Sequence, residues 1–247
     1  MSQPFLSVII PAYNEAERLP LTLVAIDKYL QGVNYPYEIL VVNDGSTDTT
    51  AAIVKKMSEI VKNLKLIDNK TNQGKGAVVK QGMLLAKGRY RLFTDADNST
   101  AIDHFEKMLP YLDQGCEVII GSRTIKGSVL EPAQPLYKQA LGKLSNLVIQ
   151  IVNVPGIWDT QCGFKAFTDE AAEKIFSIAR TNGWGFDIEV LALARCFGYQ
   201  IKEIPVKWVN SPLSHVQPSA YLKTFLENIK IRWWILSNKY EIRNPKS

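Results

Sequence analysis

The chain has 247 residues, of which 46% are hydrophobic and 21% are charged. This composition is typical of a folded globular protein and excludes a disordered, collagen-like or disulfide-stapled chain. Lysine and arginine outnumber acidic residues by 29 to 24, and most of this excess falls in residues 219–247, so the remainder is too nearly neutral for a general nucleic-acid-binding protein.

Short apolar runs alternate with helical patterns through the first half of the chain. Each run has the length of a buried parallel strand. The expected strands are residues 6–10, 39–42, 64–67, 90–94 and 117–120. Helical spacing of apolar residues marks 15–30, a helix including 53–57, and 76–87, after which Gly88 is the expected C-cap. Repeated strand–helix–strand units predict an α/β fold with a mostly parallel central sheet and helices on both faces.

The pattern changes after about residue 125. A loop with two prolines, 127–135, precedes an apolar helix over 136–154 that Gly142 is expected to interrupt. The later expected elements are a strand at 162–167, helices at 170–180 and 186–197, an edge strand at 200–208 and an amphipathic helix at 219–236. We therefore divide the chain into a main domain, residues 1–218, and a basic C-terminal helix and tail, residues 219–247.

Polar residues follow the first, second and fourth expected strands, in segments 11–15, 43–48 and 95–99. Ligands of open parallel sheets bind beyond the carboxyl ends of the strands, so we expect these segments to converge. Asp95 and Asp97 are spaced as a pair that could hold Mg²⁺ or Mn²⁺, with water and diphosphate oxygens completing the shell. Such an ion would neutralise charge on a departing nucleoside diphosphate.

Several of these residues also have ordinary structural interpretations. We expect Asp48 to cap a helix and Asp44 to meet a ligand. Glu15 opens a helix, where an acidic residue suits the helix dipole. Residues 72–76 resemble a phosphate cradle but lack the P-loop spacing, so an ordinary helix start is an equal alternative.

Four segments, SVIIPAYNE, VVNDGSTD, GKGAVVKQGM and FTDADNST, together resemble the inverting family 2 glycosyltransferases, whose nucleotide-diphospho-sugar transferase fold is the Rossmann-like GT-A fold. The later segments GSR (121–123), DTQCGFKAFT (159–168) and WGFDIEVL (184–191) resemble the branch that makes polyprenyl-phosphate sugars, and are especially similar to dolichyl-phosphate β-glucosyltransferases. The resemblance covers residues 5–210 and implies a GT-A domain over residues 1–218.

The resemblance also implies roles for individual residues. The residues that would bind the nucleotide donor are Pro11, Ala12, Tyr13, Glu15, Asp44, Lys75, Gly76, Asp95 and Ala96. Asp95 and Asp97 would hold the metal. Ser99 occupies the position at which related enzymes carry a Gln that helps to bind the metal. The residues that would form the acceptor side are Gln161, Cys162, Gly163, Phe164 and Lys165, with Lys138 as a further cation.

Asp97, Asp187 and Arg123 are the candidate catalytic residues. Asp187 and Glu189 stand where many family 2 enzymes keep a general base, which speeds hydroxyl attack by roughly 10²–10⁴-fold. A phosphate monoester has a second pKa of about 6 and needs no base at pH 7. Under a lipid-phosphate acceptor Asp187 would orient the donor, and an exposed structural role for Glu189 is equally favoured. The cations that could hold the acceptor phosphate are Arg123, Lys126, Lys138 and Lys165.

The C-terminal helix has two compatible interpretations. Its stripe of Leu222, Phe225 and Ile229 is expected to pack on the main domain, which is the favoured interpretation. Trp233 and Trp234, beside several cations, are typical of a helix at a membrane interface. The eukaryotic glucosyltransferases carry an N-terminal anchor that does not precede Pro4 here, so anchoring would be peripheral, or a segment is missing, or the acceptor is not a membrane lipid.

No signal peptide or membrane span is expected, and the three cysteines have no metal or disulfide spacing. His104 and His215 are expected to be structural or surface residues. We expect a cytoplasmic protein, peripheral on the cytoplasmic face of a membrane, that binds a nucleotide sugar and a polyprenyl phosphate but no nucleic acid.

The sequence thus predicts a metal-dependent inverting glycosyltransferase that moves a sugar, most simply glucose from UDP-glucose, onto a polyprenyl phosphate. Three alternatives stay open at this point. The acceptor could be a sugar hydroxyl of a polysaccharide or glycolipid, the reaction could be nucleotidyl transfer, or the protein could bind nucleotide sugars without catalysis.

Overall fold

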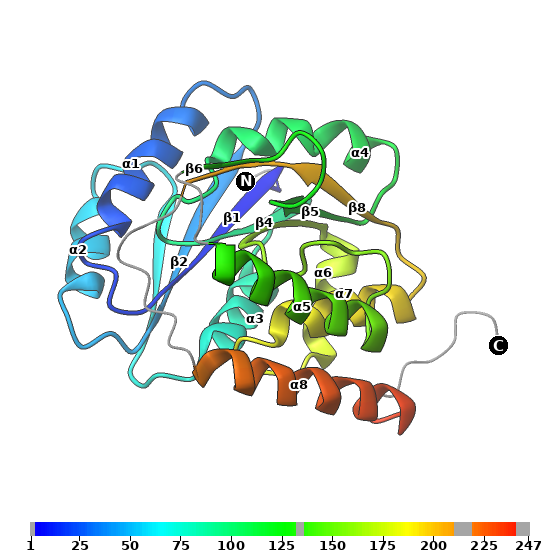
Figure 1. Cartoon of the computed structure of the whole chain (residues 1–247). Coiled ribbons are helices and arrows are strands. Elements are labelled where there is room, and N and C mark those ends of the chain that lie inside the picture. Colours follow the sequence, from blue (N-terminus) through cyan, green and yellow to red (C-terminus); the bar gives the residue numbers. More distant parts are fainter. Residues whose placement is uncertain (1–2, 132–135, 210–218, 241–247) are drawn as a thin grey trace.

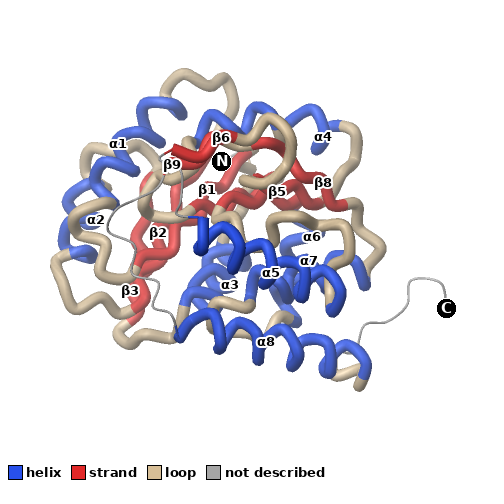
Figure 2. Tube along the Cα trace, viewed as in Figure 1, coloured by secondary structure: helices blue, strands red, loops and turns tan. Residues whose placement is uncertain are grey.

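The computed structural model describes residues 3–131, 136–209 and 219–240. Its centre is a seven-stranded sheet (Figure 2). In spatial order the strands are β3 (Leu64–Asn69), β2 (Tyr37–Asp44), β1 (Leu6–Ala12), β4 (Tyr90–Thr94), β7 (Phe164–Thr168), β5 (Val118–Ser122) and β8 (Ile201–Pro205). Only β7 runs antiparallel to its neighbours, so the predicted mostly parallel sheet is confirmed.

Helices cover both faces of this sheet (Figure 1). One face carries α1 (Leu19–Leu30), α2 (Thr50–Met57), the 3₁₀ helix η1 (Ile102–Lys107) and α4 (Leu109–Asp113). The other carries α3 (Lys75–Leu85), α6 (Asp169–Ile178) and α7 (Phe186–Cys196), with α5 (Leu136–Val152) and α8 (Ser219–Leu236) side by side outside them. Two helical layers explain why the strands are continuous apolar runs: Val8 and Ile10 enter one core and Ile9 the other.

The carboxyl ends of β2, β1 and β4 lie side by side at one edge of the sheet. β1 pairs in parallel with β2 through Ala12 and Asn43, and with β4 through Ile9 and Phe93. The three polar loops that follow these strands therefore start from adjacent positions. The predicted convergence is confirmed.

Several expected boundaries differ from the structure. Helix α1 begins at Leu19 and not at residue 15, because the backbone N–H of Glu15 donates to Thr50 Oγ1 and holds the preceding turn in place. Gly88 is not a helix cap: α3 ends at Leu85, and the N–H of Gly88 donates to the hydroxyl of Ser7 in β1.

The second half also departs from expectation. The expected loop at 127–135 contains β6 (Val129–Glu131), and its residues 132–135 lie outside the described part. The expected strand at 200–208 is two strands, β8 in the main sheet and β9 (Lys207–Val209), which pairs with β6. Gly142 does not interrupt α5, which is continuous from Leu136 to Val152.

Helix α8 has the predicted bounds but the opposite orientation. Phe225 and Ile229 of the predicted packing stripe are 45% and 49% exposed, so the expectation that this stripe packs inward is wrong. The buried face instead carries Thr224, Asn228 and Ile231; at its centre the side-chain amide of Asn153 donates to the backbone and side-chain oxygens of Asn228. The side chain of Leu222 lies outside the described part. Among the described residues, none of the helices is both long and apolar enough to cross a bilayer.

Candidate active site

A cavity of about 340 Å³ lies beyond the carboxyl ends of β1, β2 and β4. Its lining includes all the predicted donor-binding residues except Gly76, together with Asp97. Gly76 is instead packed behind the wall, because its N–H donates to the carbonyl of Asn182 and an added Cβ would lie 2.3 Å from Thr181 O.

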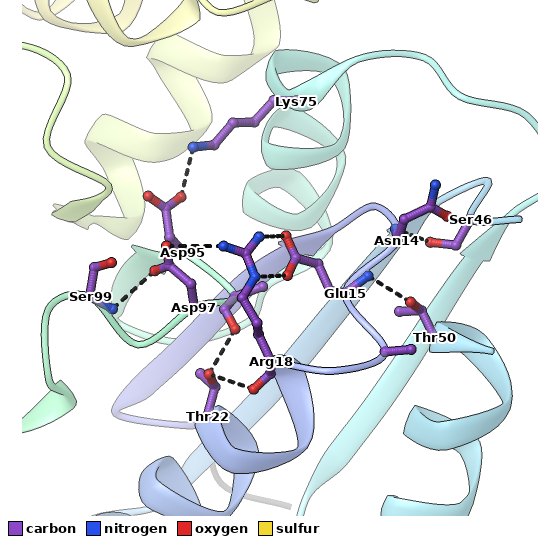
Figure 3. A network of polar contacts seen from close by, with 12 residues as sticks. Asn14, Glu15, Arg18, Thr22, Ser46, Thr50, Lys75, Asp95, Asp97 and Ser99 are labelled. Atoms are coloured by element: carbon purple, nitrogen blue, oxygen red, sulfur yellow. Dashed lines mark hydrogen bonds and ion pairs between the residues drawn. The ribbon is translucent and has the colours of Figure 1, made fainter. Parts of the chain in front are cut away.

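The loops after β1 and β2 hold one another in place. Asn14, with a positive φ of 54°, donates its N–H to Ser46 Oγ and accepts the N–H of Thr47 through its side chain (Figure 3). Asp48 Oδ1 accepts the N–H of Thr50, the first residue of α2, which is the expected helix-start role. These contacts fix the Pro11–Glu15 segment at the mouth of the cavity.

Asp44 lines the cavity from the carboxyl end of β2. Its carboxylate accepts the N–H groups of Gln73 at 2.7 Å and Gly74 at 3.0 Å, so it organises the loop that precedes α3. Burial raises the pKa of Asp44, although these two hydrogen bonds oppose the rise. The loop at 72–76 leads into α3, which confirms the helix start, and Asn72, Gly74 and Lys75 also line the cavity, while the phosphate cradle stays a prediction.

The carboxylates of Asp95 and Asp97 point into the cavity from the end of β4. Asp95 Oδ1 lies 2.7 Å from Lys75 Nζ, and Asp97 Oδ2 lies 3.6 Å from Arg18, whose guanidinium also binds Glu15 (Figure 3). Burial works to lower the pKa of Lys75, but the negative charges of Asp95 and Asp187 outweigh it and raise that pKa.

This pair of carboxylates fits a hard divalent cation. Asp95 Oδ1 is buried and lies 2.7 Å from the ammonium of Lys75, so a divalent cation would share this carboxylate with Lys75 or displace the ammonium from it. Asp97 keeps its orientation because its Oδ1 accepts the N–H of Ser99. Within the described residues no group of three or more His, Cys, Asp or Glu could hold a metal, so Mg²⁺ or Mn²⁺ would take its other ligands from water and a diphosphate.

Gly163 lies directly against Asp95. The carbonyl of Gly163 accepts the N–H of Asp95, and an added Cβ at position 163 would lie only 1.8 Å from Asp95 Oδ2. Only glycine therefore leaves room for the carboxylate. Gly163 was expected on the acceptor side, which stays a prediction; the structure shows it packed against Asp95, one of the two candidate metal-binding carboxylates.

The predicted catalytic Asp187 forms a buried ion pair behind the cavity. Its Oδ1 lies 2.5 Å from the ammonium of Lys165, which is 0% exposed and also donates to the carbonyl of Cys162. Burial raises the pKa of Asp187, while the charges of Lys165 and Lys75 oppose the rise. Lys165 is thus committed to Asp187 and does not face a phosphate acceptor.

Glu189 also differs from expectation, because it is buried and not exposed. It accepts the N–H groups of Arg180 and Thr181 and the hydroxyl of Tyr240. His104 has the expected structural role, since its Nε2 accepts the N–H of Lys207.

None of the other predicted acceptor residues whose side chains the structure describes lines the cavity. Arg123 donates to both carboxylate oxygens of Asp159 through Nε and Nη2, and its guanidinium lies 5.5 Å from the centre of the Trp208 ring. Burial works to raise the pKa of Asp159, but the positive charge and hydrogen bonds of Arg123 outweigh it and hold that pKa below its ordinary value. Gln161 is half-buried, Cys162 and Phe164 are buried and Lys126 is exposed, whereas His215 and the side chain of Lys138 lie outside the described part.

Sequence reasoning assigned no role to some residues of the cavity, namely Arg18, Val78, Gly183 and Trp184, whereas Asn72 and Gly74 belong to the 72–76 segment that it singled out. Arg18 had one visible signal, its position three residues after Glu15 at a helix start. Trp184 opens the WGFDIEVL segment that carries the resemblance, but no local pattern placed it at the cavity, because it comes from the loop before α7, far along the chain from most other lining residues. Its ring lies 5.0 Å from Lys75 Nζ.

The cavity thus lies at the carboxyl edge of a mostly parallel sheet, where folds of this class bind their ligands, and paired aspartates line it. The family model "Glycosyl transferase family 2" matches residues 7–176. The chain belongs to glycosyltransferase family 2 and is a glycosyltransferase, so the non-catalytic alternative falls away.

Curated relatives agree over nearly the whole chain. The chain is 35% identical to a dolichyl-phosphate beta-glucosyltransferase of Trichomonas vaginalis, covering 99% of this chain and 78% of the relative. It is 34% identical to the dolichyl-phosphate beta-glucosyltransferase of Dictyostelium discoideum, covering 97% and 77%.

Solved structures confirm the GT-A fold. Glucosyl-3-phosphoglycerate synthase from Mycobacterium tuberculosis, in complex with Mn²⁺, UDP-glucose and phosphoglyceric acid, has a TM-score of 0.61 at 17% identity. The likeness covers 92% of this chain and 80% of that one. At this identity the comparison supports the fold alone.

Proposed function

We propose that this enzyme transfers glucose from UDP-glucose to a polyprenyl phosphate of the dolichyl type, with inversion at the anomeric carbon. A phosphate oxygen of the acceptor forms a bond to the anomeric carbon, the bond from that carbon to UDP breaks, and UDP leaves. The observation that carries the proposal is the likeness, over most of the chain, to relatives named for this reaction, joined to a cavity with paired aspartates.

The donor would lie along the cavity from Asp44 to Asp97. Asp44, at the end of β2, would accept hydrogen bonds from the nucleoside, and Tyr13 would cover it from the loop after β1. Lys75 and Arg18 would meet the diphosphate, because both cations already reach the carboxylates beside it. When bound between Asp95 and Asp97, Mg²⁺ or Mn²⁺ would supply Lewis-acid stabilisation of the leaving diphosphate.

A phosphate acceptor needs cations to bind its negative charge, but it needs no general base. A phosphate dianion carries its own nucleophilic oxygen at neutral pH, so no side chain has to remove a proton. The buried ion pair of Asp187 with Lys165 agrees with a positioning role for Asp187. Arg123, with Lys126 and Lys138, remains the proposed set of cations for the acceptor phosphate.

Asp187→Asn separates the lipid-phosphate acceptor from a sugar hydroxyl. We expect a loss of about 3 kcal/mol of unfolding free energy, because Lys165 loses its buried counter-ion. Activity should fall only about tenfold in assays run below the lowered melting temperature, whereas loss of a general base costs roughly 10²–10⁴-fold. Asp103→Asn, at an exposed carboxylate, is the control; a thousandfold loss at unchanged stability would favour the hydroxyl acceptor.

The proposal is tested by incubating the pure protein with UDP- or GDP-sugars, Mg²⁺ or Mn²⁺, and a short polyprenyl phosphate. UDP release from UDP-glucose that requires the lipid phosphate is the expected result. Release with a sugar acceptor in place of the lipid would contradict the acceptor, release of GDP from GDP-sugars would contradict the donor, and pyrophosphate among the products would indicate nucleotidyl transfer.

A lipid acceptor places the enzyme at a membrane, and α8 is the surface we propose for that contact. Residues 1–218 would then be the catalytic domain and 219–247 its membrane-facing helix and tail.

The outer face of α8 is exposed and apolar, and comprises Phe225, Leu226, Ile229, Trp233 and Leu236. Leu147 and Ile151 of neighbouring α5 extend it, and Lys239 stacks 4.2 Å from the ring of Trp233. Aromatic and basic residues together suit an anionic lipid surface, which we expect to be the cytoplasmic face.

Phe225→Ser combined with Trp233→Ser should weaken binding to vesicles containing phosphatidylglycerol at least about tenfold, because the membrane then buries two fewer large apolar side chains. Co-sedimentation at low and high salt measures this. The control is Leu21→Ser with Val24→Ser, two exposed apolar residues on α1, which covers the other face of the sheet. Equal vesicle binding by both double variants would exclude α8 as the contact surface.

A further inference from the structure

One wall of the donor cavity comes from the loop between α6 and α7. Gly183 and Trp184 line the cavity, and Trp184 stacks with Lys75, the lysine that reaches Asp95 at 2.7 Å. The position of this loop therefore bears directly on the cation that faces the diphosphate. Trp184 is flanked by Gly183 and Gly185, which have no side chains that could fix the position of this part of the loop.

The loop is held from outside the catalytic core by α8. Glu227, on the inner side of that helix, accepts the N–H of Gly185 at 2.6 Å. An added Cβ at Gly183 would lie 2.4 Å from Glu227 Oε1, and one at Gly185 would lie 2.7 Å from Glu227 Cβ. The two glycines thus let the loop close onto Glu227.

The start of the same loop is also tied to the end of α8. Glu189 accepts the N–H groups of Arg180 and Thr181, and its third partner is the hydroxyl of Tyr240, which follows α8. In between, the carbonyl of Asn182 accepts the N–H of Gly76 at the start of α3. The loop is therefore held between α8 and α3.

We propose that Glu227 is a positioning residue for donor binding: it holds the Gly183–Gly185 turn so that Trp184 and Lys75 face the diphosphate. The inference rests on the proposed function for the nature of the donor. It makes α8 part of the nucleotide site as well as the proposed membrane surface. Glu227 touches neither donor nor acceptor, and acts through the turn.

The test compares Glu227→Ala with Glu227→Gln in the full chain. Calorimetry first establishes whether the wild-type protein binds UDP or GDP with Mn²⁺, and that nucleotide is the probe. Affinity should fall about tenfold in Glu227→Ala, because a hydrogen bond from Gly185 to a charged group is lost. Glu227→Gln, which keeps an acceptor oxygen, should stay within about twofold. Glu170→Ala, an exposed glutamate on α6, is the matched control.

Hydrogen–deuterium exchange without nucleotide provides a second readout. The amides of residues 183–185 should exchange about tenfold faster in Glu227→Ala than in the wild type. The amides of α1 should exchange at the same rate in both proteins. Unaltered exchange together with unaltered affinity would overturn the inference, and so would an equal loss of affinity in the Gln variant. Failure of the wild type to bind either nucleotide would contradict the proposed function, and the exchange result alone would then decide the inference.

Discussion

Gly163→Ala is expected to reduce glycosyl transfer by at least about a hundredfold while the protein still folds. The new Cβ would lie 1.8 Å from Asp95 Oδ2 and 2.3 Å from its Cγ, so the carboxylate has to leave its present position. A displacement of about 1 Å in a catalytic group costs on the order of 10²-fold in rate. The UDP-release assay gives the rate, and thermal unfolding checks the fold.

Gly142→Ala is the matched control, because an added Cβ there meets nothing within 4 Å and the site lies inside α5. That variant should keep full activity and gain slightly in stability, since alanine favours a helix over glycine. Near wild-type activity in Gly163→Ala would contradict the placement of Gly163 against Asp95.

Asp97→Asn is expected to reduce metal-dependent activity about a thousandfold. Asparagine keeps the size of the side chain and can accept the N–H of Ser99 as Asp97 does. What it loses is the negative charge, and with it one of two carboxylates that would hold the cation. Stabilisation of a leaving group by a metal is worth several kcal/mol, and each 1.36 kcal/mol is a factor of ten in rate.

The measurement is the rate of UDP release over a range of Mg²⁺ and Mn²⁺ concentrations. Asp103→Asn, at an exposed carboxylate in η1, serves as the control with the same change of charge. Full activity of Asp97→Asn at low metal concentration would remove Asp97 from the metal site.

The sequence contained enough to predict the sheet and most of the residues that line the cavity at its carboxyl edge. Buried apolar runs separated by helices specify parallel strands, and parallel strands bring their carboxyl ends to one edge. For that reason Asp44, Asp95 and Asp97 could be placed together before their geometry was known. The contact of Gly163 with Asp95 could not be predicted, because it depends on the insertion of antiparallel β7 between β4 and β5.

Periodicity also failed where polar contacts decide which face of a helix is buried. The spacing of Phe225 and Ile229 in α8 predicts an inward apolar stripe. In the structure the inner face instead carries Asn228, bonded to Asn153, and Glu227, bonded to Gly185. Such partners lie on distant segments, so no local pattern reveals them. The same limitation concealed the buried pairing of Lys165 with Asp187.

The most direct test is to titrate Mn²⁺, followed by electron paramagnetic resonance, into the protein with and without UDP. The central claim is that Asp95 and Asp97, in a cavity lined by three adjacent loops, hold one divalent cation against a nucleoside diphosphate. It predicts tight Mn²⁺ binding by the wild type when UDP is present, and loss of that binding in Asp97→Asn and in Asp95→Asn. Mn²⁺ that binds equally well to all three proteins, or UDP that binds with no regard to Mn²⁺, would contradict it.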